Sequence, residues 1–218
     1  MRLVAQTKLG FYPAHPDAVS AVLGHLRMPE GAVHILDPCC GEGLAIEQIR
    51  AGLGLAPENV HAVELDGGRA LAARENLGPD ANLLGPCSYL EARINANSFG
   101  MAWVNPPFDN ELGGGRRQEH TFVQNVTKQL RVGGLLVLVM PTTAIQTNTP
   151  FQDYLDNWYD ESALYAWPEE RRKYKEVVYI GYRREEPIPG DSTAPRYLRS
   201  LGLRGEPKLP TIGSDPRS

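Results

Sequence analysis

The sequence predicts an α/β fold, with a mostly parallel β-sheet, helices on both of its faces and an antiparallel hairpin at one edge. Short apolar, β-branched runs alternate with segments of helical periodicity, which is the pattern of strands joined by crossover helices. The runs are apolar at nearly every position, as expected for strands buried on both faces. The chain has 218 residues, 42% hydrophobic and 22% charged, which indicates one globular domain with an appendage and argues against disorder.

Seven apolar runs are predicted to form the strands. In chain order they are Val33–Leu36, Val60–Val63, Ala81–Leu84, Met101–Val104, Leu135–Met140, Ala163–Trp167 and Val177–Tyr182. Three segments between the first five runs have helical character. They are Leu44–Leu53, with apolar residues at helical spacing, Arg69–Asn76, rich in Ala, Arg and Glu, and Thr121–Leu130, which precedes a Gly-Gly pair. Because helices connect these runs, the first five strands are expected to be parallel.

The last two runs are joined by a short basic stretch, PEERRKYKE, which suits an antiparallel hairpin at a sheet edge. The predicted domain therefore covers residues 1–184. From Glu185 onward Pro, Gly and Ser dominate, which predicts an irregular Pro/Gly-rich tail over residues 185–218 that a partner would order.

The charge balance and the cysteines exclude several classes of protein. With 22 basic and 26 acidic side chains the net charge is −4 and the pI about 5.8, which argues against coating nucleic acid through bulk charge. Residues 165–184 carry 6 basic and 3 acidic side chains, so contact with a polyanion is expected late in the chain. No apolar run approaches the ~18 residues that span a bilayer. Three cysteines without CxxC spacing fit neither a disulfide framework nor a zinc site, so we expect a reduced, cytoplasmic protein without a metal.

A glycine-rich turn, DPCCGEG, follows the first strand and precedes the first predicted helix. Open α/β sheets bind ligands at this edge, where Gly41 and Gly43 let backbone amides approach a ligand at a helix N-terminus. Glu64 ends the next strand, where a carboxylate would accept hydrogen bonds from ribose hydroxyls. The turn therefore predicts a cofactor that contains a nucleoside.

Two cofactor classes fit such a turn, and the residues favour one of them. Dinucleotide enzymes need a third glycine, but Ile46 stands at that position. The carboxylates of Asp37 and Glu42 would repel a diphosphate, whereas they suit a ligand that bears an ammonium and a sulfonium. This favours S-adenosylmethionine over NAD. Cys39 and Cys40 are interpreted as small packing residues of the turn.

The tetrapeptide Asn105-Pro106-Pro107-Phe108 directly follows the fourth strand, beside the predicted cofactor turn. Its two prolines remove two N–H donors and leave carbonyls as acceptors. The Asn105 side chain and the Pro106 carbonyl can accept both hydrogens of a planar exocyclic amine, and Phe108 offers a face on which an extruded base or a planar amide can stack. The tetrapeptide predicts methyl transfer to an amine by orientation and desolvation, without a general base.

With these motifs the chain resembles the class I S-adenosylmethionine-dependent methyltransferases. NPPF matches the (D/N/S)PP(Y/F) signature of the amino-methylating branch, in the gamma order of the N6-adenine enzymes. DPCCGEG and ELD resemble motifs I and II, and the segment KLGFYPAHP at 8–16 resembles the one that covers the methionine part of the cofactor. The resemblance implies a Rossmann-like sheet of seven strands. It also implies these cofactor-binding residues: Phe11, Tyr12, Pro13, His15, Asp37, Pro38, Cys39, Gly41, Gly43, Glu64, Leu65, Ser88 and Asn105.

The resemblance makes N6 of adenine in DNA the expected acceptor. Two basic stretches are candidate phosphate contacts: the glycine-rich loop at 109–120, and a later strip in which Trp167 and Tyr174 are interleaved. Their basic residues are Arg116, Arg117, Arg171, Arg172 and Lys173. Because only irregular residues follow position 184, we expect no large target-recognition domain like that of restriction-type enzymes, which favours a protein partner for target recognition.

Three other functions stay open from the sequence. The acceptor can be an RNA base, adenine N6 or guanine N2, although in the ribosomal-RNA guanine enzymes NPPF is commonly followed by His, whereas Asp109 follows here. Glutamine N5 methylation of a protein uses a similar NPPY tetrapeptide. The non-enzymatic alternative is a cofactor-binding subunit of a modification complex.

Overall fold

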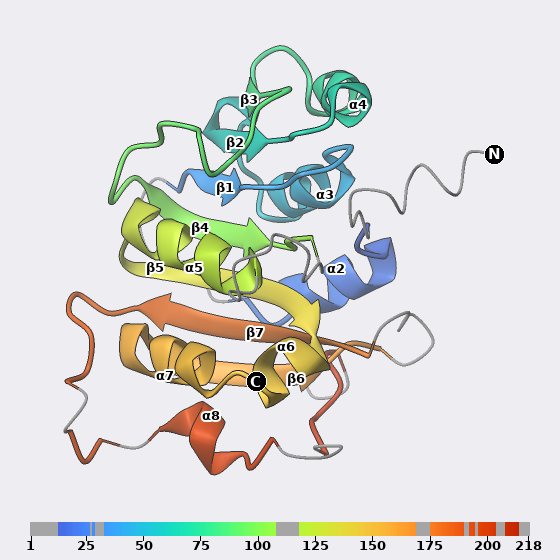
Figure 1. The fold of residues 1–218 in the computed structure, drawn as a ribbon. Helices are drawn as coiled ribbons and strands as arrows, with labels where there is room; N and C mark the ends of the chain where they lie inside the picture. Colours follow the sequence, from blue (N-terminus) through green and yellow to red (C-terminus); the bar gives the residue numbers. More distant parts are fainter. Residues whose placement is uncertain are drawn as a thin grey trace.

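The computed structural model describes residues 13–26, 28, 33–107, 118–168, 175–189, 192–194, 196–203 and 208–213. They form the predicted α/β fold around one seven-stranded sheet of order β3-β2-β1-β4-β5-β7-β6 (Figure 1). The strands are β1 (Ile35–Asp37), β2 (Val60–Val63), β3 (Asn82–Leu84), β4 (Phe99–Val104), β5 (Leu130–Pro141), β6 (Tyr159–Ala166) and β7 (Glu176–Arg183). Every predicted strand is present, within a few residues of its expected bounds.

Helices cover both faces of the sheet, as predicted (Figure 1). One face carries α2 (Pro16–Leu23), α3 (Leu44–Gly52) and α4 (Gly67–Leu77), and the other carries α5 (Gln118–Gln129), α6 (Thr142–Gln146) and α7 (Thr149–Trp158). Along β5, Leu135 and Val137 pack on the first face, while Leu136 and Leu138 pack on the second, and all four are fully buried. Within the described part of the chain, no helix combines the length and apolar character needed to cross a membrane.

Three of these helices, α2, α6 and α7, were not predicted from the sequence. α2 begins after His15, whose Nδ1 accepts a hydrogen bond from the Asp17 N–H. α7 begins after Asn148, whose side chain accepts from the Phe151 N–H at 3.2 Å, and Pro150 stands in its first turn. An asparagine cap followed by a proline is a helix-start signal that was present in the sequence.

The strand directions agree with the prediction, and the structure adds their order. β1 to β5 are parallel, and β7 is antiparallel to both β5 and β6. The chain leaves β5 through α6 and α7, forms β6 at the edge of the sheet, and returns as β7 into the position between β5 and β6. The register of β7 pairs Val178 with both Val139 and Tyr165, so this strand is buried on both sides.

The C-terminal tail differs from the predicted irregular segment in the residues that are described. It contains a short helix, α8 (Tyr197–Ser200), and its apolar side chains Leu198, Leu203 and Ile212 are at most 3% exposed. The Leu198 N–H donates to Asp156 of α7 at 2.9 Å, and the Ile212 N–H donates to the Ala166 carbonyl at 3.0 Å. These parts are held by the domain itself, because a few apolar residues dispersed among the prolines and glycines suffice to anchor them.

Candidate active site

The carboxyl ends of β1, β2 and β4 bring the predicted motifs together at one edge of the sheet. These strands are neighbours in the order β2-β1-β4, so the turn after β1 lies between the ends of the other two. The Gly41 N–H donates to Glu64 Oε2 at 2.9 Å, which joins the turn to the end of β2. The Cys39 thiol donates to the Asn105 carbonyl at 3.2 Å, which joins it to the tetrapeptide after β4. Residues up to 66 positions apart thus meet in one site.

The glycine turn depends on backbone conformations that other residues rarely adopt. Gly41 has φ +59° and Gly43 has φ +78°, both in the left-handed region. Gly43 is the N-cap of α3, and a Cβ atom there would lie 3.0 Å from the Leu77 side chain of α4. The absence of a side chain at Gly43 therefore lets α4 pack against the start of α3. Pro38 is buried beneath the same turn.

Asp37 ends β1 and is buried, with 2% of its surface exposed. Burial raises the pKa of its carboxyl to about 8, with a further contribution from the nearby Glu64 carboxylate, while the hydrogen bond from the Cys39 N–H opposes the rise. That hydrogen bond measures 3.0 Å. Near neutral pH the carboxyl therefore keeps its proton, and a positively charged ligand beside it would stabilise the ionised form.

Glu64 ends β2 and is also buried, with 4% of its surface exposed, but hydrogen bonds and an ion pair compensate the burial of its carboxylate. Its Oε1 accepts hydrogen bonds from the Asp66 N–H at 2.7 Å and from Nε and Nη2 of Arg69 at 3.0 and 2.8 Å. Its Oε2 accepts the Gly41 N–H. Arg69 was missed in the sequence, although a cation in the first turn of α4, just after the Asp66 N-cap, is placed to reach back to the strand end.

The tetrapeptide after β4 is only partly described. Asn105 and Pro107 are half-buried and Pro106 is buried, whereas Phe108 lies outside the described residues. Cys39, expected to be a small packing residue, holds the Asn105 carbonyl instead. Burial is the main cause that raises the pKa of the Cys39 thiol, so the thiol stays protonated and remains a donor.

A third segment, 85–88, approaches the end of β2 from β3. The Cys87 N–H donates to the Glu64 carbonyl at 2.9 Å, and a Cβ atom on Gly85 would lie 2.7 Å from the Ala70 side chain. Ser88 is half-buried and follows directly. Beside this segment Leu65 exposes 58% of its surface, which is unusual for a leucine that adjoins a buried strand.

The remaining predicted residues are placed as follows. His15 is half-buried and caps α2, and Pro13 before it is exposed. The Gln48 side chain of α3 donates to the Pro16 carbonyl at 2.9 Å, which fastens this segment beside the helix of the glycine turn. The predicted residues Phe11, Tyr12, Arg116, Arg117, Arg171, Arg172 and Lys173 lie outside the described residues.

One expectation for the basic strip is wrong. Trp167 was interpreted as an aromatic interleaved among phosphate contacts, but it is 3% exposed and packs in the core on the α2–α3 face. The backbone N–H of Trp167 donates to the Glu176 carbonyl at 3.0 Å, which continues the β6–β7 pairing by one residue. Because the indole ring is buried in the core, it is not available to stack on a base.

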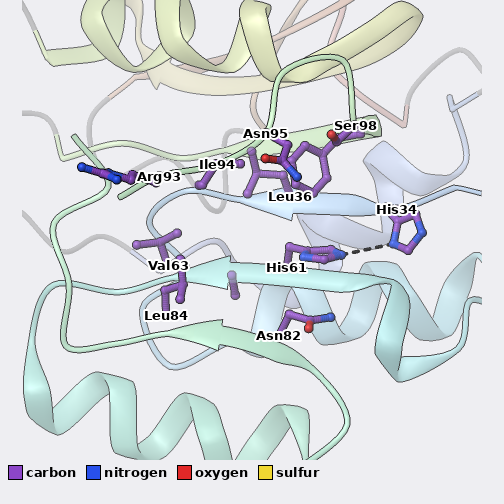
Figure 2. Close-up of a pocket in the computed structure, with 12 residues that line it drawn as sticks. His34, Leu36, His61, Val63, Asn82, Leu84, Arg93, Ile94, Asn95 and Ser98 are labelled. Carbon is purple, nitrogen blue, oxygen red and sulfur yellow. Dashed lines mark hydrogen bonds between the residues drawn. The ribbon is translucent and has the colours of Figure 1, made fainter. Parts of the chain in front are cut away.

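A pocket of about 490 Å³ lies on the sheet face beneath the connection from β3 to β4 (Figure 2). That connection, residues 85–98, contains neither helix nor strand. Leu36 and Val63 form part of the pocket floor. At its side, Nδ1 of His34 and Nε2 of His61 lie 3.1 Å apart, within hydrogen-bond distance. The two histidines are thus partners of each other. None of the predicted site residues that the structure describes lines this pocket.

Comparison with known proteins shows the family and the fold. The sequence profile of an uncharacterised methyltransferase family (DUF6094) matches residues 1–200. No curated protein matches the chain. Among solved structures, the type IIG restriction endonuclease BpuSI has a TM-score of 0.65 at 16% identity, over 92% of this chain and 29% of that one.

Two further structures have the same fold. A modification subunit of a putative type I restriction enzyme from Vibrio vulnificus has a TM-score of 0.63 at 15% identity, over 88% of this chain and 50% of that one. A putative class I S-adenosylmethionine-dependent methyltransferase from Listeria monocytogenes has a TM-score of 0.60 at 15% identity, over 89% of this chain and 68% of that one. This chain therefore spans only about a third of the endonuclease and half of the modification subunit.

Proposed function

Since the chain belongs to this methyltransferase family, we propose that it transfers a methyl group from S-adenosylmethionine to the exocyclic amine of a nucleic-acid base, adenine N6 in DNA. The observation that carries the proposal is the contact between the glycine turn and the tetrapeptide, in which the Cys39 thiol meets the Asn105 carbonyl at 3.2 Å. A cofactor turn and an amine-accepting corner belong to one site only if they are adjacent.

The residues at the strand ends fit S-adenosylmethionine. Glu64 Oε2 accepts one hydrogen bond from the protein, so it has capacity for a ribose hydroxyl. The exposed Leu65 side chain offers an apolar surface for an adenine ring, with Ser88 as the candidate polar contact for that ring. The buried carboxyl of Asp37 suits a ligand with positive charge, since that charge would favour its ionised form.

The chemistry asks little of the protein beyond orientation. When bound, S-adenosylmethionine supplies an electrophilic methyl group. The Asn105 side chain and the Pro106 carbonyl accept the two N–H groups of the target amine, which aims the nitrogen lone pair and fixes the plane of the base. Asp37 is not needed as a base, because the amine loses its proton after the new bond has formed. Phe108 is proposed to stack on the extruded base.

A nucleic-acid acceptor is supported by the tetrapeptide and by the likeness of fold to two restriction-modification proteins. In this proposal Arg116 and Arg117, and the strip with Arg171, Arg172 and Lys173, contact phosphates. A partner protein supplies target recognition, since the matched modification protein is itself named as a subunit and this chain spans half of it.

Mass spectrometry of nucleosides tests the acceptor directly. DNA from cells that express the chain should contain N6-methyladenine, which cells with the Asn105→Ala variant should lack. With purified protein, that variant should lose at least about 100-fold in methyl transfer but keep its affinity for S-adenosylmethionine within about threefold. Asn95→Ala is the matched control, because Asn95 is exposed on the connection between β3 and β4.

Full activity of Asn105→Ala would contradict the proposal that Asn105 and Pro106 accept the target amine. Methylated bases in RNA, or methylated glutamine in protein, with unmodified DNA would replace the proposed acceptor by one of the alternatives. Co-purification of a second chain that is needed for activity would identify the recognition partner.

A further inference from the structure

A cleft of about 400 Å³ lies between α5 and α7, two helices that cover the same face of the sheet (Figure 1). It is near the carboxyl ends of both helices, where β5 begins and β7 ends. Asn105, in contrast, follows the end of β4, which runs parallel to β5, so the cleft and the transfer site are at opposite edges of the sheet. The cleft is lined by Thr121, Gln124, Asn125, Thr127, Lys128, Tyr154, Trp158 and Arg183.

The cleft carries positive charge that the protein does not neutralise from within its lining. Lys128 and Arg183 line it, and among the described residues no aspartate or glutamate does. The nearest carboxylates of α7 are used elsewhere, since Asp153 pairs with Arg199 at 2.5 Å and Asp156 accepts the Leu198 N–H at 2.9 Å. The acidic side chains of α7 therefore bind residues of the C-terminal tail and do not neutralise the cations of the cleft.

The Arg183 guanidinium is fixed in position. Its Nη1 donates to the Leu130 carbonyl at 2.6 Å and to the Asn97 side chain at 2.5 Å. A guanidinium that is already oriented loses little conformational freedom when it binds an anion. The Lys128 side chain, exposed on the last turn of α5, adds a second cation.

The wall on the α7 side is aromatic. Tyr154 and Trp158 are one helical turn apart, their ring centroids are separated by 6.3 Å, and both rings are only half-buried. On the α5 side, the side chains of Gln124 and Asn125 supply amide groups. Cations, half-buried aromatic rings and amides together are the groups that recognise a phosphate joined to a planar base.

We propose that this cleft binds a nucleotide unit, with its phosphate on Lys128 and Arg183 and its base against Trp158. The site is separate from the transfer site, and the proposal does not depend on the identity of the methyl acceptor. A free nucleotide and a nucleotide within a single strand present the same chemistry, and the experiment below distinguishes them.

Tryptophan fluorescence gives a local readout. Of the three tryptophans, Trp103 and Trp167 are buried, with 1% and 3% exposure, so only Trp158 is accessible to a bound base. With saturating S-adenosylhomocysteine present to fill the cofactor site, adenosine 5′-monophosphate should quench the emission in a saturable way. Adenosine and inorganic phosphate, each with half of the contacts, should bind at least about tenfold more weakly.

Variants assign the binding to the cleft. Lys128→Glu should weaken the binding of adenosine 5′-monophosphate at least about tenfold, whereas Lys208→Glu, the same change at an exposed lysine in the tail, should leave it within about twofold. Trp158→Phe should abolish the optical change while calorimetry still detects the ligand. Thermal melting checks that each variant is folded.

A hexadeoxynucleotide then identifies the source of the nucleotide. Tighter binding of the oligonucleotide than of the mononucleotide, with the same loss in Lys128→Glu, indicates a single strand as the occupant, and equal or weaker binding indicates a free nucleotide. The proposal is overturned if neither probe quenches Trp158, if adenosine binds as well as its monophosphate, or if Lys128→Glu and Lys208→Glu behave alike.

Discussion

The ends of β1 and β2 each hold a buried carboxylate, and the protein compensates the two in different ways. The Glu64 carboxylate accepts four hydrogen bonds and pairs with Arg69 at 2.8 Å, whereas among the described residues Asp37 accepts the backbone N–H of Cys39 and faces the negative charge of Glu64. A buried charge needs a partner or gives up its ionised form. Glu64 therefore acts as a clamp that holds the glycine turn, and Asp37 is left in a form that a cationic ligand can ionise.

The largest expected effect comes from breaking the clamp. Glu64→Ala removes the buried carboxylate from the Arg69 guanidinium, whose side chain is 15% exposed, and the acceptor from the Gly41 N–H, so the free energy of unfolding should fall by about 3–5 kcal/mol. Urea denaturation measures it. Glu47→Ala is the matched control, since its pair with Arg50 is more exposed and should contribute about 0–1 kcal/mol. Equal losses in the two variants would contradict the role of Glu64 as a clamp.

The second prediction concerns the pH dependence that Asp37 causes. Its pKa is about 8 in the folded protein and 3.8 ordinarily, so between these values folding takes up a proton and stability decreases as the pH rises. Asp37→Asn removes this contribution. Relative to the wild type, the variant should gain stability with pH, by at most about 1.4 kcal/mol per pH unit, until the gain levels off above about pH 8.

Urea denaturation at several pH values between 5 and 9 measures this difference. The Asp37→Asn variant should also lose more affinity for S-adenosylmethionine than for S-adenosylhomocysteine, because only the former bears the sulfonium charge. Parallel stability curves for the variant and the wild type would show that Asp37 is ionised throughout, and the contrast with Glu64 would then disappear.

The smallest expected effect separates backbone strain from packing in the turn itself. Gly43→Ala places a side chain at φ +78° and 3.0 Å from Leu77, whereas Gly54→Ala meets the same kind of strain, at φ +66°, with nothing within 4 Å. Both should lose about 1 kcal/mol for the left-handed conformation, and Gly43→Ala should lose about 1–2 kcal/mol more for the contact. Denaturation midpoints compare them. Identical losses would mean that Leu77 moves aside freely.

Much of the fold could be predicted because its signals are local. The alternation of apolar runs and helical segments gave the strands and their directions, and DPCCGEG and NPPF marked the two strand ends that meet at Cys39 and Asn105. The insertion of β7 between β5 and β6 had no such signal, since an antiparallel pair can add to the sheet by either of its strands. The packing of the tail was also missed, because its anchors are single apolar residues such as Leu198.

The chemistry available at the site is encoded locally, since glycines that adopt positive φ, a diproline corner and an acidic strand end are properties of short segments. How those groups are used depends on the packing of distant segments. That packing paired Glu64 with Arg69, turned the Cys39 thiol to the Asn105 carbonyl, and buried Asp37 deeply enough to raise its pKa. Desolvation and hydrogen bonding depend on what surrounds a group in space, and those neighbours come from segments that are far apart in the chain.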